Sequence, residues 1–260
     1  MIKKLTFLAS LLLVIGIVGA ALTIKPVLNA ESTTKEQILK EDFTAVNIDA
    51  ENIAVNIKST NDSQATIEMV TRSSEYNLMT DVNDNTLAIK VKHEYKKLFS
   101  FDFFNFTPKL NIYLPEQDYN KVNITTTNGI ISVENITSEE VGAISTNGII
   151  KLKDVIANKV KTETENGMID LENVEGDITS VTTNGKVDLR TPDLDRMIDV
   201  KTTNGRIKLV TDKKPTNATI AVSISNGKAT VFGSSNPHSV YGDGENQVKL
   251  TTENGLITVE

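Results

Sequence analysis

The sequence contains no cysteine and no tryptophan, and it has only two histidines in 260 residues. The absence of cysteine excludes disulfides, thiolate metal ligands and a cysteine nucleophile. His93 and His238 lie in unlike segments with no adjoining serine or aspartate motif, so we expect two solvated loop histidines rather than a catalytic pair. The sequence also lacks a phosphate-binding P-loop, a dinucleotide-binding glycine pattern, zinc-ligand spacing and an EF-hand loop. We therefore expect no cofactor.

Basic side chains are in the minority. Residues 31–260 contain 24 Lys and Arg against 34 Asp and Glu, which gives this part of the chain a net charge of −10. Such a surface repels the phosphate backbone of DNA or RNA. We therefore expect no nucleic-acid partner.

Charge is absent from a segment near the N-terminus. Leu5–Ile24 is a run of twenty residues without a charged side chain, and Lys3 and Lys4 precede it. A helix of that length crosses about 30 Å of hydrocarbon. The two lysines favour a cytoplasmic N-terminus. Residues 1–30 are thus predicted to anchor the chain in the cell membrane as a single-pass protein, with residues 31–260 extracellular.

Cleavage of this segment is an open alternative. Small residues that suit a signal peptidase occur at Val18-Gly19-Ala20 and at Leu28-Asn29-Ala30. A signal peptide cut at either place would make the protein secreted. A buried core helix is a third interpretation, and the missing cysteine excludes a lipoprotein anchor.

A repeat organises the rest of the chain. An Asn-Gly pair occurs seven times, at successive spacings of 19, 19, 18, 20, 22 and 28 residues. Repeats of this length are typical of solenoids and propellers. The corner asparagines of the seven copies are Asn128, Asn147, Asn166, Asn184, Asn204, Asn226 and Asn254.

Aligning the copies on these asparagines shows two apolar columns. The residue three positions after Asn is Ile, Val or Ala, the residue five positions after it is Val or Leu, and the residue between them is polar. A period of two is that of a strand with one buried and one solvated face. Each repeat is therefore predicted to form a strand, a sharp corner at Asn-Gly and a second strand.

Two all-β folds fit this pattern. Asn-Gly between alternating runs is typical of antiparallel hairpins. The recurrence of one residue type at one offset instead favours a parallel β-solenoid with coils of roughly 19 residues, in which each residue lies above its equivalent. Glycine would supply positive φ at the corner, where Asn is tolerated. With coils about 4.8 Å apart, the asparagine side chains are expected to form a hydrogen-bonded ladder.

The flanking segments are less regular. Residues 31–42 are polar and are predicted to form a stalk or short helical cap, whereas residues 43–260 are predicted to form one solenoid. Within it, residues 43–120 alternate like strands but lack the Asn-Gly corner, so we interpret them as irregular first coils. Residues 121–260 hold the regular repeats. The long last repeats are predicted to bulge as loops that could cover an open strand edge.

An aromatic insertion interrupts the first part of the solenoid. Residues 93–108 hold five of the eight phenylalanines beside two lysines. One interpretation is a hairpin or lid that packs its rings over the solenoid. The other is an exposed patch that docks on a lipid surface or a protein partner. The residues proposed for such binding are Lys96, Lys97, Phe99, Phe101, Phe103, Phe104 and Phe106.

Carboxylates also align on the outward side of the repeats. Asp170 and Asp188 occupy one column in adjacent coils, and Glu172 lies nearby. The interpretation we prefer is a solvated face of mixed charge, because Lys151 and Lys208 bracket the same column. A calcium site and a catalytic carboxylate pair are the two alternatives.

Together these features resemble a known family. A charge-free N-terminal segment, strands that end at Leu114-Pro115 and repeated Thr-Thr-Asn-Gly-x-Ile-x-Leu units resemble the bacterial putative-adhesin domain of unknown function, and in particular its LiaG-like membrane-anchored members. The resemblance covers about residues 43–260. It implies a right-handed parallel β-solenoid outside a Gram-positive-type membrane, associated with the response to cell-envelope stress. It supplies no catalytic residues.

The function predicted from the sequence is therefore that of a non-enzymatic, membrane-anchored extracytoplasmic protein. It would act as an adhesin or envelope stress-response accessory by binding an envelope protein, a lipid surface or a wall polymer. Two alternatives remain open. One is a carbohydrate-active β-helix enzyme, a lyase or hydrolase that uses Asp170, Asp188 and Glu172, and the other is a purely structural spacer.

Overall fold

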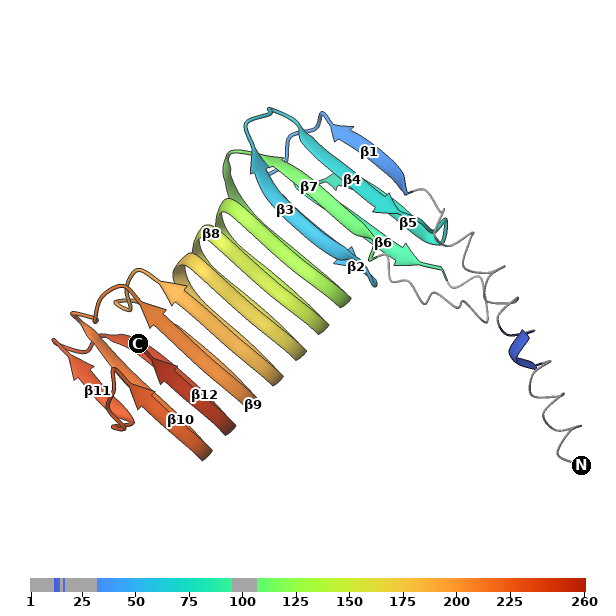
Figure 1. Ribbon diagram of the computed structural model, residues 1–260. Coiled ribbons are helices and arrows are strands. Elements are labelled where there is room, and N and C mark those ends of the chain that lie inside the picture. Colours follow the sequence, from blue (N-terminus) through green and yellow to red (C-terminus); the bar gives the residue numbers. More distant parts are fainter. Residues whose placement is uncertain (1–11, 15, 17–31, 95–106) are drawn as a thin grey trace, which may run out of the picture.

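The computed structural model describes residues 12–14, 16, 32–94 and 107–260, and most of the described residues from 32 onward lie in β-strands (Figure 1). Its strands join in one open sheet. They are β1 (Thr33–Leu39), β2 (Ala45–Ala50), β3 (Ala54–Thr60), β4 (Ala65–Thr71), β5 (Tyr76–Asn83), β6 (Thr86–His93), β7 (Lys109–Pro115), β8 (Asp118–Thr191), β9 (Ile198–Thr211), β10 (Ala218–Val231), β11 (His238–Tyr241) and β12 (Asn246–Val259).

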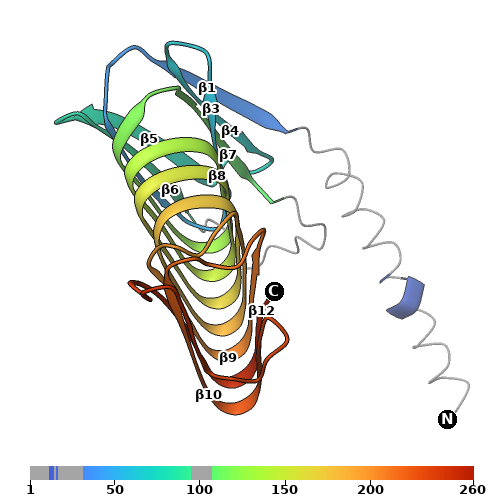
Figure 2. The same cartoon turned by 90° about the vertical axis from the view of Figure 1, so that its left-hand side faces the viewer.

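The regular repeats form a parallel stack. Strand β8 is 74 residues long and winds through successive coils, which Figure 2 shows in an oblique view along the stack. Strand β9 continues the stack in parallel, with Thr182 beside Thr202, Asn184 beside Asn204 and Leu189 beside Leu209. Equivalent residues thus lie above one another, as the column pattern predicts. The alternative of antiparallel hairpins is wrong for the repeats.

The last coils do not stack in chain order. Strand β12 lies between β9 and β10, and it pairs in parallel with both. The final Asn-Gly repeat is therefore an interior layer, while β10, which comes earlier in the chain, lies next to the end of the stack. Strand β11 pairs antiparallel with the first four residues of β10, Ala218–Ala221.

The first part of the fold differs from the irregular coils expected for residues 43–120. Strands β2 and β3 do pair in parallel with β8, and together they form the layer next to its first coil. However, β5 and β6 form an antiparallel hairpin, and β4 is antiparallel to both β1 and β7. The hairpin has a local cause, because Asp84 and Asn85 have φ values of 48° and 58°. Two successive residues with positive φ make a turn that matches the twist of paired strands.

The segment before the repeats also differs from the prediction. Thr33–Leu39 forms strand β1, whereas composition predicted a polar stalk or short helical cap. Six of its seven side chains are exposed, and the strand is held by antiparallel pairing with β4 from Thr33–Thr71 to Leu39–Ala65. Backbone pairing to an existing sheet edge therefore orders a segment that has almost no apolar face.

The predicted anchor at residues 1–30 lies outside the described residues, apart from 12–14 and 16. Within the described ranges, no helix is long and apolar enough to span a bilayer.

The core follows the axis of the stack. Two columns are buried in every repeat: the residue four positions before each corner asparagine and the residue five positions after it. The residue three positions after the asparagine is also buried in most repeats, for example Ile131, Ile150 and Ile169. The threonine column two positions before the corner faces inward as well, for example Thr164, Thr182 and Thr202. The period-two pattern of the sequence therefore correctly predicts which side of each strand is buried.

Candidate functional site

The residues proposed from the sequence for partner or membrane binding lie outside the described residues. They fall within residues 95–106. The binding role proposed for the insertion at 93–108 therefore stays a prediction.

The corner asparagines form the ladder that the repeat predicts. In each bond, the Nδ2 of one asparagine donates to the Oδ1 of the next layer toward β2 and β3, at donor–acceptor distances from 2.6 to 3.0 Å. In spatial order the ladder is Asn52, Asn128, Asn147, Asn166, Asn184, Asn204, Asn254 and Asn226. The sequence did not reveal Asn52 as a member, because Ile53 rather than glycine follows it.

Glycine is required at these corners mainly by close backbone packing. A Cβ atom on Gly255 would collide with the carbonyl oxygen of Gly205 in the adjacent coil. Both glycines have φ of +157°, a conformation that residues with a Cβ rarely adopt. None of the seven asparagines of the Asn-Gly pairs has positive φ. Within the ladder, only Asn52 adopts the left-handed conformation, with φ of 55°.

A second corner runs parallel to the first. Asn135, Asp154 and Asn173 each lie seven residues after a ladder asparagine and have φ values of 56°, 51° and 52°. The Asn173 Nδ2 donates to Asp154 Oδ1 at 2.9 Å. Asn and Asp tolerate the left-handed conformation better than other residues with a Cβ. Sequence reasoning missed this corner, although an Asn or Asp at a fixed offset was the signal for it.

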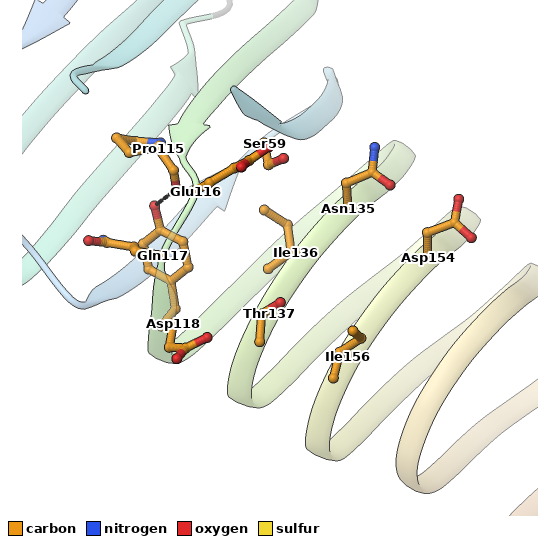
Figure 3. Close-up of a pocket in the computed structure, with 11 residues that line it drawn as sticks. Ser59, Pro115, Glu116, Gln117, Asp118, Asn135, Ile136, Thr137, Asp154 and Ile156 are labelled. Atoms are coloured by element: carbon orange, nitrogen blue, oxygen red, sulfur yellow. Dashed lines mark hydrogen bonds between the residues drawn. The ribbon is translucent and has the colours of Figure 1, made fainter. Parts of the chain in front are cut away.

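A groove lies between this second corner and the turn that joins β7 to β8 (Figure 3). Its volume is about 630 Å³. The turn contributes one wall, the end of β3 contributes Ser59, and the first coils of β8 contribute the rest. The lining residues are Ser59, Pro115, Glu116, Gln117, Asp118, Tyr119, Asn135, Ile136, Thr137, Asp154 and Ile156.

The groove has an acidic and amide-rich lining. Glu116, Asp118 and Asp154 contribute carboxylates, and none of the lining residues is Lys, Arg or His. The apolar part of the lining comes from Pro115, Ile136, Ile156 and the ring of Tyr119, and Ile156 leaves 51% of its surface exposed. The groove thus offers hydrogen-bond acceptors and negative charge beside a small apolar surface.

The turn that forms the wall is held rigidly. The Tyr119 hydroxyl donates to the Pro115 carbonyl oxygen at 2.8 Å, and the Gln117 amide donates to the Phe43 carbonyl oxygen at 2.8 Å. The Tyr119 ring stacks on Phe43 with centroids 6.3 Å apart. Burial raises the pKa of the Tyr119 phenol to about 12, so it stays neutral at physiological pH. A preorganised wall lowers the entropy lost when a ligand binds.

The carboxylates that the sequence offered as a catalytic or calcium-binding set lie on the outward face of β8. Asp188 contacts the Lys186 ammonium at 3.0 Å and the Arg206 guanidinium at 3.2 Å, and Glu172 contacts Lys153 at 3.4 Å. These contacts support a face of mixed charge. Within the described residues, no group of three or more His, Asp or Glu side chains is arranged to hold a metal ion.

The two histidines lie in strands rather than in the loops expected for them. His93 ends β6, where its side chain is only 15% exposed, contacts Glu75 at 3.5 Å and packs against Tyr76 with ring centroids 4.5 Å apart. His238 begins β11 and is exposed. The prediction of a solvated side chain is therefore wrong for His93, because the hairpin of β5 and β6 places it beside Tyr76.

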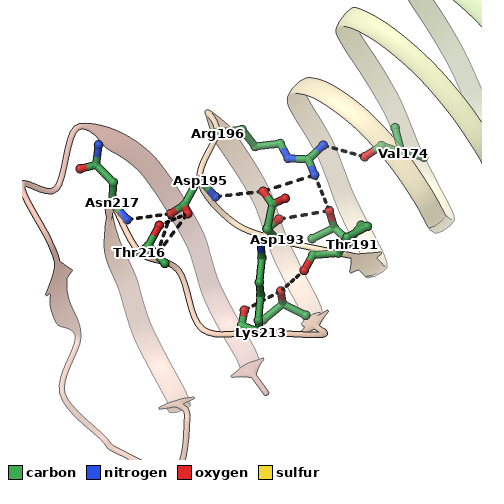
Figure 4. A network of polar contacts seen from close by, with 10 residues as sticks. Val174, Thr191, Asp193, Asp195, Arg196, Lys213, Thr216 and Asn217 are labelled. Carbon is green, nitrogen blue, oxygen red and sulfur yellow. Dashed lines mark hydrogen bonds and ion pairs between the residues drawn. The ribbon is translucent and has the colours of Figure 1, made fainter.

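A polar network ties the loops that follow β8 and β9 (Figure 4). The Asp195 carboxylate accepts bonds from the Thr216 N–H and hydroxyl and from the Asn217 N–H, at 2.6 to 3.1 Å. These hydrogen bonds lower the pKa of Asp195, and the bond from the Thr216 side chain has the largest effect. Arg196 donates to the Val174 carbonyl oxygen at 3.1 Å. Because these side chains bond to one another and join successive layers, we interpret the network as structural. The groove is therefore the candidate binding site.

A family model described as Toastrack DUF4097 matches residues 43–260. Among solved structures, a "putative adhesin" from Bacteroides fragilis has a TM-score of 0.50 at 12% identity, covering 89% of this chain and 99% of that one. A "putative cell adhesion protein" from Clostridium sporogenes has a TM-score of 0.42 at 15% identity, covering 87% and 99%. At these identities the likeness to the Bacteroides structure supports the fold alone. No curated protein matches the chain.

Proposed function

Because the chain belongs to the Toastrack DUF4097 family, we propose that it is a non-enzymatic, adhesin-like binding protein of the cell envelope. Its groove would take up a segment of a wall polymer that carries hydroxyl and amine groups. The observation that carries this proposal is the lining of the groove, with three carboxylates and no basic side chain.

The chemistry of the lining selects the ligand class. Carboxylates and amide oxygens accept hydrogen bonds from sugar hydroxyls, and carboxylates also attract ammonium groups. The same charges repel phosphate and carboxylate groups, so a strongly anionic polymer fits poorly. The exposed part of Ile156 offers an apolar contact for the carbon face of a sugar ring.

The rest of the proposed function concerns location. The charge-free segment Leu5–Ile24 supports a single-pass membrane anchor with residues 31–260 outside the cell, or a secreted protein if the segment is cleaved. The resemblance to LiaG-like proteins supports a role in the envelope stress response. The insertion at 93–108 would then supply a second contact, to a lipid surface or an envelope protein, near the membrane.

A binding assay with the full chain in nanodiscs tests this proposal. The probes are a chitosan oligosaccharide, its N-acetylated counterpart and polygalacturonate, which represent cationic, neutral and anionic polymers. Binding should be tightest to chitosan and absent for polygalacturonate. It should weaken about tenfold or more in a variant with Glu116→Gln, Asp118→Asn and Asp154→Asn, because opposite charges no longer meet.

The matched control changes the same amount of charge elsewhere. Asp177, Asp199 and Glu253 are exposed and lie outside the groove, so their amide substitutions should leave binding unchanged. Equal losses in the two triple variants would show that net charge, not the groove, attracts the polymer. Shortening of any of the three polymers during the incubation would instead support the carbohydrate-active alternative.

A further inference from the structure

One edge of the sheet is incompletely covered at the end of the stack. Strand β10 pairs with β12 from Ala218 to Val231 on one side. On its other side, β11 covers only Ala218–Ala221, the Val222 N–H donates to the Pro237 carbonyl oxygen at 2.7 Å, and Val231 bridges to Ser234. Residues 223–230 have no further strand beside them in the described part of the chain.

The core is also open at this end. Ile224 and Ala229 occupy inward columns, yet both are only half-buried. Their equivalents one layer deeper, Thr252 and Ile257, are 1% and 0% exposed. The difference is that β12 has a strand on each side, whereas β10 has one on only one side of residues 223–230. A further strand would bury these two side chains as the deeper layers are buried.

The asparagine ladder has a direction that ends here. Every ladder bond runs from the Nδ2 of one layer to the Oδ1 of the layer nearer β2 and β3. Asn226 therefore uses its Nδ2 on Asn254 and presents its Oδ1 toward the uncovered side. The next layer would have to bring an amide donor to this oxygen.

The sequence of this edge contains little that opposes strand addition. Residues 223–230 contain one charged residue, Lys228, and no proline, whereas charges and prolines commonly protect the edges of natural sheets. From these observations we infer that residues 223–230 form a strand-addition site for an extended segment of a partner protein, which pairs in parallel with β10. The segment alternates apolar and polar residues and carries Asn or Gln at the corner.

A second copy of this chain fits the edge less well. In a two-fold pairing of β10 with itself, Asn226 of each copy would present an acceptor and neither would supply the donor. A head-to-tail stack of regular coils does not fit the opposite end, because β6 and β7 already cover β2 and β3. The strands that end the sheet there, β1 and β5, pair antiparallel with their neighbours and contain no Asn-Gly corner. A separate segment with a free amide donor meets both conditions. This inference is independent of the groove.

The test uses the full chain in nanodiscs and a fluorescent synthetic peptide with the sequence of residues 178–189, which contains one complete corner. Hydrogen exchange should show protection of residues 223–230 when the peptide is bound. A strand that adds to an edge uses the N–H groups of alternate residues only. N-methylation of one alternate set should therefore weaken binding at least tenfold, whereas N-methylation of the other set should leave it unchanged.

Two further changes test the register. Replacing the peptide's asparagine by alanine removes the donor for Asn226 Oδ1 and should weaken binding about threefold to tenfold, the range of a single hydrogen bond.

In the protein, the Val222 N–H faces the uncovered side, so alternation places the Ile224 N–H there too. Ile224→Pro removes that donor at an edge position and should weaken binding at least tenfold. Ser225→Ala, at an exposed side chain, is the matched control.

Four outcomes would overturn the inference. They are the absence of binding, equal losses with both N-methylated peptides, protection of β9 or β12 in place of residues 223–230, and dimerisation of the chain that the peptide competes away. The last would assign the edge to a second copy. If Ile224→Pro misfolds, the two N-methylated peptides still decide the question on the unmodified protein.

Discussion

Asn254 donates a hydrogen bond to Asn204 at 2.9 Å across 50 residues of sequence, whereas Asn226, which lies between them in the chain, bonds to the far side of Asn254 at 3.0 Å. The last repeat is therefore inserted between two earlier ones. Strand β10 pairs along its whole length with β12 and not with β9, the strand that precedes it in the chain. The C-terminal strand is accordingly an interior layer that holds the end of the stack together.

Ile257→Ala tests the interior position of β12. Ile257 is fully buried between β9 and β10, so the substitution should lower the free energy of unfolding by about 2–5 kcal/mol. Leu256→Ala is the matched control, because Leu256 is 38% exposed, and it should cost less than about 1 kcal/mol. Urea denaturation measures both. Similar small losses would mean that β12 lies at an end of the stack.

Gly255→Ala tests the close approach of the glycine corners. The new Cβ would meet the Gly205 carbonyl oxygen, and the backbone would have to shift. We expect a loss of at least about 2 kcal/mol in the free energy of unfolding, from overpacking and from the disfavoured φ. Gly233→Ala provides the comparison, because Gly233 has φ of +81° but no atom within 4 Å of the added Cβ. It should cost only about 1–2 kcal/mol.

The asparagine ladder should protect the Asn-Gly pairs from deamidation. Asn-Gly deamidates readily in flexible chains, but the reaction requires the glycine nitrogen to attack the asparagine side chain. In Asn147, Asn166 and Asn184 the amide is held by bonds to both neighbouring layers. Mass spectrometry should find slow isoaspartate formation at these sites and faster formation at Asn226, at the end of the ladder. Rates equal to those of the unfolded chain would contradict the ladder.

The Tyr119 phenol should make stability depend on alkaline pH. Burial raises its folded pKa to about 12, above an unfolded value of about 10. A group with a raised pKa contributes its full stability below the unfolded pKa and loses it as the pH rises through the folded pKa. Stability should therefore fall between about pH 10 and 12. Tyr119→Phe should flatten this fall in melting temperature, and Tyr113→Phe, at a tyrosine that is only half-buried, is the control.

The hydrogen-bonded Asp195 carboxylate should make stability depend on acidic pH. Hydrogen bonds from Thr216 and Asn217 lower its folded pKa, so its contribution is present above the unfolded pKa and is lost as the pH falls through the folded one. The loss should begin near pH 4, the ordinary value for an aspartate. Asp195→Asn should reduce the slope of stability against pH below that point, while Asp199→Asn, at an exposed strand position, should leave it unchanged.

The candidate site shows where reasoning from sequence stops. Glu116, Asp118 and Asp154 come from a turn and from a coil that starts some thirty residues later, and no short motif joins them. Their proximity depends on the stacking of β8 under β3 and on the tight turn that Tyr119 and Gln117 hold. By contrast, the second corner at Asn135, Asp154 and Asn173 had a signal in the repeat, because its members recur at one offset.

The sequence by itself determined the parallel stack, the inward columns and the asparagine ladder. These features depend on a local period of two and on a repeat that places like residues above one another, and both are written in the order of residues. The antiparallel pairing of β1 and the place of β12 were decided by the tertiary structure. The inward positions of the two strands are about equally apolar: β12 has Leu250 and Ile257 where β10 has Val222 and Ala229, but β10 has Ile224 where β12 has Thr252. Which strand lies inside depends on pairing with β9, a strand far away in the chain, and no local pattern records that pairing.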